Sequence, residues 1–394
     1  VLQGGADLTL EAAERFDLLA DGAIDTTDGP DNETTLWFKD EDGGSLLIDL
    51  KAPITLQPSQ TLIGDGTEVT VHSGALIQNG IDLAAADATV SVQGGTFSES
   101  LRVNKRITID GGGTTVVEGA SPALIVTSGQ NLTVTGVMYQ TSSNDHTVVV
   151  HGTLTMTNCI VRETNGGKKA AVRVHGAGAT LNVAGGGNVF NVRGDGWLVS
   201  TSRPDNIDAT GNTWRQDGVT LTNNFRIEDL MVHGTNTGKG LVYWQGNSVF
   251  VTTPGTGSPG ESIQKAVDTA TAGDTIWIEG GTFNESVTVA KNLTVDGGGS
   301  AVIQGASPAL TVTGGSVVVN AATLQTSTED HTVVVNGGAL TLTGCTVHET
   351  DYVGGAPKAA LYIWGGGSSV DLAGGGNIFN VRGSGRLIRN SLPG

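Results

Sequence analysis

The sequence predicts an all-β fold, a right-handed parallel β-helix solenoid made of two tandem repeats with short capping helices. Three observations predict it. Glycine makes up 60 of the 394 residues and falls in GG and GGG clusters, short runs alternate aliphatic with polar residues, and one long segment occurs twice. Clustered glycine excludes collagen, which needs glycine at every third position. The recurring Val, Ile and Leu argue against disorder.

The internal repeat is the strongest of these signals. The segment GGTFSESLRVNKRITIDGGGTTVVEGASPALIVT begins at Gly94 and returns from Gly280 as GGTFNESVTVAKNLTVDGGGSAVIQGASPALTVT. The correspondence extends to AGGGNVFNVRGDG from Ala184, which matches AGGGNIFNVRGSG from Ala373. The copies differ most around residues 164–169, so this stretch is predicted to be a loop.

These signals divide the chain into four parts. Residues 1–50 are predicted to be an N-terminal capping segment, 51–204 the first β-helix repeat, 205–261 a connector with aromatic-rich strands and loops, and 262–394 the second β-helix repeat. The second copy stops where the first copy meets the connector. We therefore interpret the chain as part of a longer array, or as one whose open end is completed by another molecule.

Within each copy the basic unit is a short alternating run followed by glycine, as in ITIDGGG, LTVTG and LNVAGGG. Alternation places the aliphatic side chains on one face of a half-buried strand. The glycines supply the conformations that a sharp corner needs. An antiparallel sandwich would call for NG or DG hairpin turns. GGG corners followed at once by another short strand favour a parallel coil instead.

Two segments are predicted to be amphipathic helices that cover open ends of the apolar coil. In residues 262–273, Ser262 can cap the helix, the apolar side chains at 263, 266, 267 and 270 share one face, and Gly273 can end it. Residues 9–22, TLEAAERFDLLADG, show a similar apolar stripe. A short helix in either place would shield the end of a β-coil.

Charge and cysteine content limit the partners. The net charge of −18 disfavours nucleic acid and anionic membranes. The acidity either keeps a large surface soluble or provides calcium sites between acidic loops, and no other cofactor is expected. Cys159 and Cys345 occupy equivalent places in the two copies, so two buried thiols are predicted rather than a disulfide. No apolar run could span a bilayer and no signal peptide precedes Val1, so a secreted protein would be present in mature or truncated form.

The segment SIQKAVDTATAGDTIWIEGGTFNESVTVAKNLTVDGGG resembles the opening of right-handed β-helix proteins of the pectin-lyase-like superfamily. Together with the first copy, the resemblance covers about two thirds of the chain. The arrangement with a connector also resembles repeat modules of large secreted bacterial surface proteins, which implies an extracellular or cell-surface location. The superfamily includes pectate lyases, pectin methylesterases and polygalacturonases. Neither the esterase pattern of paired aspartates nor the polygalacturonase cluster NTD…DD…HG is found, and a fold alone does not imply an activity.

Charged residues flanking the variable loop are the first candidate ligand or partner surface. They are Glu163 and Arg193 in the first copy and Glu349 and Arg382 in the second. The neighbouring Arg162, Lys169, His348 and Lys358 would extend a charged stripe in each copy. Such a stripe can bind sugar, with avidity from duplication, or consist of solvated ion pairs beside a loop.

Aromatic residues of the connector are the second candidate surface. Trp214, Tyr243 and Trp244 either pack against the coil and join the two copies, or form a sugar-stacking or partner-binding surface. Two further motifs, each of which occurs once in each copy, are interpreted as structural. Asp145-His146 and Asp330-His331 begin equivalent strands, where neighbouring side chains point to opposite faces and cannot act together in catalysis. The GGGN-x-F motif places Asn188 and Asn377 at corners and Phe190 and Phe379 inside.

The sequence therefore predicts an extracellular structural or adhesive β-helix protein that self-assembles end to end into a fibre or surface layer. Its expected partners are further copies of itself, other cell-surface components or a polysaccharide. No catalytic residues are assigned. The alternatives are a polysaccharide-active lyase or hydrolase, and a carbohydrate-binding adhesin.

Overall fold

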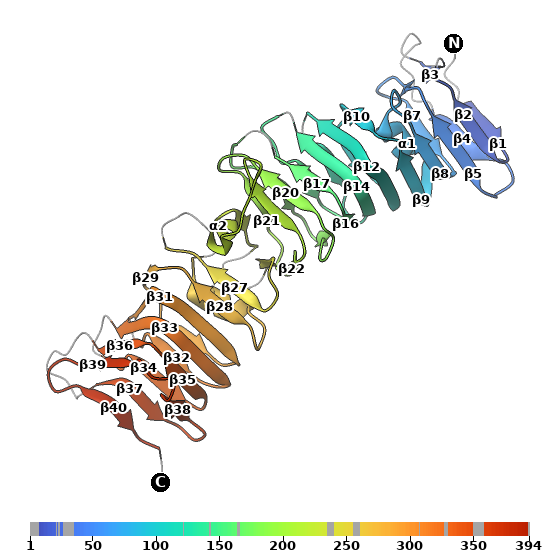
Figure 1. Ribbon diagram of the computed structural model, residues 1–394. Coiled ribbons are helices and arrows are strands. Elements are labelled where there is room, and N and C mark those ends of the chain that lie inside the picture. The colour runs from blue at the N-terminus through green and yellow to red at the C-terminus, as the bar shows by residue number, and fades with distance from the viewer. Residues whose placement is uncertain are drawn as a thin grey trace. The chain divides into compact units, whose positions relative to one another are not determined.

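Short strands stacked coil upon coil dominate the computed structural model (Figure 1). It describes residues 8–20, 22, 24–26, 35–120, 122–141, 143–163, 166–234, 240–254, 261–306, 308–326, 330–349 and 358–392. Nearly every strand pairs in parallel with a strand of the next coil. The chain is thus a parallel β-solenoid, which confirms the predicted fold class. It forms two compact units, residues 1–203 with 207–221 and residues 204–206 with 222–394.

The first unit is built around one long sheet and several shorter ones. The long sheet contains, in order, β2 (Arg15–Leu18), β5 (Leu46–Leu50), β8 (Gly66–Val71), β9 (Ala84–Val92), β12 (Ile107–Gly119), β14 (Asn131–Thr141), β17 (Ile160–Arg162), β20 (Val189–Val192), β23 (Thr213–Gln216) and β24 (Val219–Thr220), with β10 (Gly95–Phe97), β16 (Thr153–Thr157) and β19 (Thr180–Asn182) beside it. A second sheet contains β11 (Leu101–Val103), β13 (Leu124–Val126), β15 (Val148–Val150), β18 (Ala170–Val174) and β21 (Trp197–Thr201). The remaining strands are β1 (Leu8–Ala12), β4 (Thr35–Asp40) and β7 (Thr61–Gly64) in one sheet, β3 (Ile24–Asp25) with β6 (Ile54–Thr55), and β22 (Ile207–Asp208).

The glycine clusters bend long strands around a corner, as the sequence predicted. The register between β12 and β14 shifts between Asp110 and Thr115, across the GGG cluster. Gly112 and Gly113 have φ values of 58° and 79°, which favour glycine. The Thr115 hydroxyl donates to the carbonyl of Gly111 at 2.9 Å and fixes the bend. One chain segment can therefore line two sides of the coil.

The helix predicted for residues 9–22 is wrong. β1 and β2 occupy this segment and pair in parallel with β4 and β5, with Phe16 opposite Ile48. The rings of Phe16 and Phe38 lie 5.0 Å apart. Parallel pairing satisfies the backbone along an existing strand edge, which overrides the local helix propensity of this stretch.

Two helices occupy equivalent positions in the two copies. α3 (Ile263–Thr269) confirms the helix predicted from residue 262, and the Ser262 hydroxyl accepts from the Lys265 N–H at 3.2 Å. It ends before Gly273. α1 (Ile77–Leu83) was not predicted, because Gly80 interrupts its pattern. A Cβ on Gly80 would lie 2.5 Å from Val71, so glycine lets the helix approach β8 closely. Strands precede α1, so it lies within the stack rather than at an end.

Side chains of the next coil close both ends of α1. The backbone N–H groups of Ile77 and Gln78 donate to the two carboxylate oxygens of Glu99 at 2.7 and 3.0 Å. Lys105 Nζ donates to the carbonyl oxygens of Asp82 and Ala84 at 2.9 and 2.8 Å. Burial raises the pKa of Glu99 while these N–H donors lower it. The helix termini, which lack internal partners, are satisfied by two charged groups six residues apart.

The second copy repeats this arrangement around α3. Ile263 and Gln264 donate their N–H groups to Glu285 at 2.9 and 3.0 Å. Lys291 Nζ donates to the carbonyls of Asp268 and Ala270 at the other end. The GTF-x-E motif and the lysine that follows it therefore have a structural role in both copies.

The second unit has the same layered core. Its long sheet contains β27 (Ser248–Val251), β28 (Thr275–Ile278), β31 (Leu293–Gly305), β33 (Ser316–Thr326), β35 (Ala339–Thr343) and β38 (Ser369–Asp371), with β29 (Gly281–Phe283), β36 (Thr346–Glu349) and β39 (Ile378–Asn380) beside it. A five-stranded sheet contains β30 (Val287–Val289), β32 (Leu310–Val312), β34 (Val333–Asn336), β37 (Ala359–Trp364) and β40 (Arg386–Asn390). The unit also contains α2 (Asn224–Asp229), β25 (Met231–Val232) and β26 (Val242–Tyr243).

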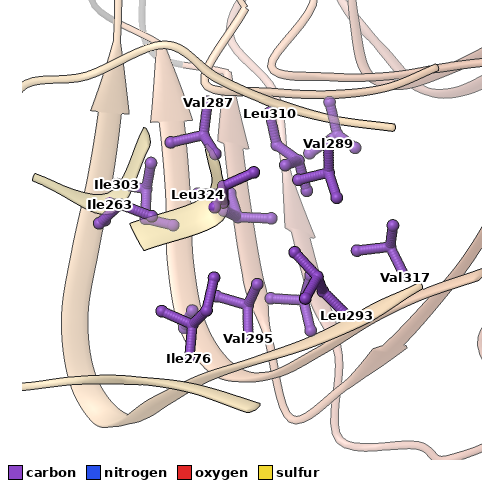
Figure 2. Packing of buried hydrophobic residues seen from close by; sticks show 14 of the residues in the cluster. Ile263, Ile276, Val287, Val289, Leu293, Val295, Ile303, Leu310, Val317 and Leu324 are labelled. Atoms are coloured by element: carbon purple, nitrogen blue, oxygen red, sulfur yellow. The ribbon is translucent and has the colours of Figure 1, made fainter. Parts of the chain in front are cut away.

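Figure 2 shows how inward side chains of successive coils meet in this core. Ile276 and Val295 come from paired strands, and Ile263 joins them from α3. Cys159 and Cys345 are both buried and free, which confirms the prediction of two buried thiols. Burial raises the pKa of both thiols. They act as small apolar side chains of the core.

Candidate functional site

The charged residues predicted in the first copy meet in a pocket of about 300 Å³. Its lining comprises Arg162, Glu163, Asn191, Arg193, Asp217 and Gly218. β17 ends at Arg162, which pairs in register with Asn191 of β20. The turn between the antiparallel strands β23 and β24 brings Asp217 and Gly218 to the same place. Sequence analysis missed these turn residues because the hairpin belongs to the predicted connector.

The acidic side chains of this pocket accept hydrogen bonds from backbone donors. The buried carboxylate of Glu163 accepts from the N–H groups of Gly166 and Arg193 at 3.3 and 3.4 Å. Asp217 Oδ1 accepts from the Gly194 N–H at 3.1 Å. These bonds join neighbouring coils and give the pocket a preformed wall. With exposed guanidinium groups at Arg162 and Arg193, the pocket offers the donors and acceptors that bind oxygen-rich ligands.

The described residues of the second copy do not bring together the counterparts of this pocket's lining. Arg382 follows β39 and is exposed, and the side chain of Glu349 lies outside the described residues. His348 pairs in register with Asn380, as Arg162 does with Asn191. The described residues contain no counterpart of the β23–β24 hairpin beside β39.

Two of the three predicted aromatic residues, Trp214 and Trp244, stack on a phenylalanine of their own unit. Trp214 is 5 % exposed and its ring stacks on Phe190 with centroids 5.0 Å apart. Trp244 stacks on Phe250 at 5.3 Å, and its Nε1 donates to Asn224 Oδ1 at 3.3 Å. Tyr243 is half-buried. Trp214 and Trp244 thus pack beside a phenylalanine of the unit to which each belongs.

The two histidines that precede β15 and β34 serve the backbone. His146 is buried, and its Nδ1 accepts the N–H of Ala170 at 2.8 Å. Burial, reinforced by the nearby Arg173, lowers the pKa of His146 to about 4. His331 Nδ1 likewise accepts the N–H of Ala359 at 2.8 Å, and burial lowers its pKa. Each neutral ring thus holds the start of the next strand in its sheet.

The GGGN-x-F motif has the predicted structural role at both asparagines and at Phe190, whereas Phe379, which was predicted to lie inside, is half-buried. Asn188 Oδ1 accepts from the Cys159 N–H at 2.9 Å, and Asn377 Oδ1 accepts from the Cys345 N–H at 3.0 Å. Phe190 is fully buried. The asparagines therefore link successive coils at a corner.

The last described coil of the second unit leaves apolar side chains uncovered. Ile378, Leu387 and Ile388 are 55 %, 52 % and 45 % exposed. Leu198 and Val199, which correspond to Leu387 and Ile388 in the first copy, are fully buried. In the described residues β38, β39 and β40 are the outermost strands of their sheets (Figure 1). Within the described residues, no further strand pairs with the outer edges of these three strands.

The first and last described coils carry opposite charge. The described part of residues 8–26 includes the acidic side chains of Glu11, Glu14, Asp17 and Asp25 and the single base Arg15. Glu11, Glu14 and Asp17 are exposed. Residues 369–392, which include β38, β39 and β40, contain three arginines, at 382, 386 and 389, and one acidic residue, Asp371. The two coils are thus electrostatically complementary.

The fold places the chain in the class of parallel β-solenoid repeat proteins. It matches no protein-family model, and neither curated proteins nor solved structures include a significant match. Among the described residues, no group of three or more His, Cys, Asp or Glu could hold a metal ion, so calcium binding stays a prediction. No helix in the described part is long and apolar enough to cross a membrane.

Proposed function

We propose that the protein is an extracellular structural module that assembles end to end, the last coil of one copy seating the first coil of the next. The exposed Ile378, Leu387 and Ile388 carry this proposal. Leu198 and Val199, the first-copy counterparts of Leu387 and Ile388, are buried. Burying each of these side chains in the contact contributes roughly 1 kcal/mol to the free energy of association, because about half of its surface is still exposed. Strand-edge hydrogen bonds add directionality to this contact.

Charge complementarity supports the acidic first coil of a second copy as the proposed occupant. Arg382 and Arg386 lie on the basic last coil, and Glu11, Glu14 and Asp17 on the acidic first coil. Such a contact joins two different surfaces, so it leaves one free surface of each kind on every complex. Growth then continues into a filament rather than stopping at a dimer. Salt should weaken the association because exposed charges are screened.

Complementary single-end variants test this proposal. A tail variant, Leu387→Glu with Ile388→Glu, and a head variant, Glu14→Arg with Asp17→Arg, should each stop filament growth in electron microscopy. An equimolar mixture should give a heterodimer by size-exclusion chromatography with light scattering, because one competent end of each kind remains. Val219→Glu alters another exposed apolar residue, 68 % exposed, and should leave assembly intact.

Two results would overturn the proposal. One is a wild-type chain that stays monomeric over a wide concentration range at low salt. The other is a tail variant that assembles as well as Val219→Glu. Dimers formed by the tail variant alone would also contradict the proposal, because they would show that another surface joins the copies.

The pocket around Arg162 supports a second candidate function, carbohydrate binding by an adhesin. Its guanidinium and carboxylate groups suit sugar hydroxyls. Arg162→Ala with Arg193→Ala should weaken retention of the chain on a polysaccharide affinity gel at least fivefold, measured on neutral and acidic polymers. Arg382→Ala, the counterpart without a pocket, should not. Equal retention of the two variants would exclude the pocket as the binding site.

A further inference from the structure

We infer that His151 and His175 form a binding site for one divalent transition-metal ion on the surface of the first unit. His151 follows β15 and His175 follows β18. These strands pair in parallel with Val150 opposite Val174, so the two histidines are neighbours on successive coils. Their ring centroids lie 5.9 Å apart with an interplanar angle of 70°. His151 is half-buried and His175 exposed, so solvent reaches both.

The hydrogen bond of His151 prepares it to bind a metal. Its Nδ1 lies 3.0 Å from the carbonyl oxygen of His175. A carbonyl oxygen only accepts, so Nδ1 carries a proton, and in the neutral imidazole the lone pair is then on Nε2. Metal-binding histidines commonly donate their second ring N–H to a backbone carbonyl in this way, which fixes the tautomer and the ring orientation.

His175 has a matching partner on the following coil. Its Nδ1 lies 3.0 Å from the Ser202 hydroxyl oxygen, which can accept the Nδ1 proton. That bond leaves the Nε2 lone pair of His175 available as well. Each ring is thus held from the next coil, and both can present Nε2 as a ligand.

The separation of the rings suits one shared ion. A zinc–nitrogen bond is about 2.0–2.1 Å long, so two rings bound through Nε2 have centroids roughly 5–6.5 Å apart, depending on the angle at the metal. The observed 5.9 Å falls in this range. Imidazole ligands select Cu²⁺, Ni²⁺ or Zn²⁺ over Ca²⁺ and Mg²⁺, with Cu²⁺ bound most tightly. Water would complete the coordination.

The second copy provides an internal comparison. Asn336 and Trp364, at the ends of β34 and β37, stand where the first copy has His151 and His175, and they pair in the same register. Neither residue is a histidine, so this position of the second copy has no imidazole pair. We therefore expect one bound ion per chain rather than two.

Calorimetric titration of the untagged chain with Cu²⁺ and Ni²⁺ tests this inference. Wild-type protein should bind one ion, and His151→Asn or His175→Asn should weaken binding at least tenfold. His348→Asn serves as the matched control and should bind as the wild type does. Electron paramagnetic resonance of the Cu²⁺ complex should show nitrogen ligands that are lost in both site variants.

A gain-of-site variant makes the test independent of damage to the fold. Asn336→His with Trp364→His should raise the stoichiometry from one ion to two. Equal affinities of the wild type and the His151→Asn, His175→Asn double variant would overturn the inference. These titrations do not depend on assembly, because the tail variant can be used in place of the wild type.

Discussion

Replacing Glu99 with glutamine is expected to lower the free energy of unfolding of the first unit by about 2–3 kcal/mol. The Glu99 carboxylate accepts from two N–H groups at the start of α1, at 2.7 and 3.0 Å. Glutamine keeps one acceptor oxygen and places an amide that cannot accept opposite the other donor. One N–H at a partly buried helix terminus then loses its partner, and the charge that favours this end of the helix is lost.

Urea unfolding monitored by circular dichroism would measure this effect. Glu68→Gln is the matched control, because Glu68 is exposed on β8, and we expect a change within about 0.5 kcal/mol. Glu285→Gln should repeat the loss in the second unit, where Glu285 caps α3. If Glu99→Gln is no more destabilising than Glu68→Gln, the proposed cap contributes nothing.

Acidification from pH 7 to pH 4 is expected to lower the free energy of unfolding of the first unit by about 2 kcal/mol through His146. This is less than the full pKa shift would give, because solvent reaches the surrounding turn and screens the charge. Burial lowers the pKa of His146 from 6.5 to about 4. Between these values the unfolded chain binds a proton that the folded chain does not. Stability is therefore complete above pH 6.5, falls as the pH drops through this window and levels off below pH 4.

An asparagine at this position separates the charge effect from the hydrogen bond. In His146→Asn, the amide oxygen can accept the Ala170 N–H in place of Nδ1 without titrating. Thermal unfolding measured between pH 7 and pH 4 should then show that this variant loses less stability on acidification than the wild type does. His331→Asn should act in the same direction in the second unit, because burial also lowers the pKa of His331. If the His146→Asn, His331→Asn double variant loses stability with falling pH as steeply as the wild type, neither histidine causes the pH dependence.

The candidate surfaces were only partly predictable from sequence. Glu163 and Arg193 could be placed near each other because they flank strands in the same part of one repeat. Asp217 could not, because it reaches the pocket through a hairpin from the predicted connector. The pairing of His151 with His175 likewise depends on the register of β15 and β18, which alternation alone does not set. Residues far apart in sequence become neighbours only once the coils are stacked.

The sequence by itself determined the repeat, the alternating strands, the glycine corners, α3 and the buried cysteines, because each depends on local geometry or on comparison of the two copies. Only the tertiary structure decided the conformation of residues 9–18. Their sequence pattern predicts a helix, but they form β1 and β2, which pair with β4 and β5. The tertiary structure also decided α1, because Glu99 and Lys105 of the next coil stabilise a helix that contains Gly80. The physical reason is the same in both cases. Backbone partners supplied by a neighbouring coil outweigh the propensity of a short segment.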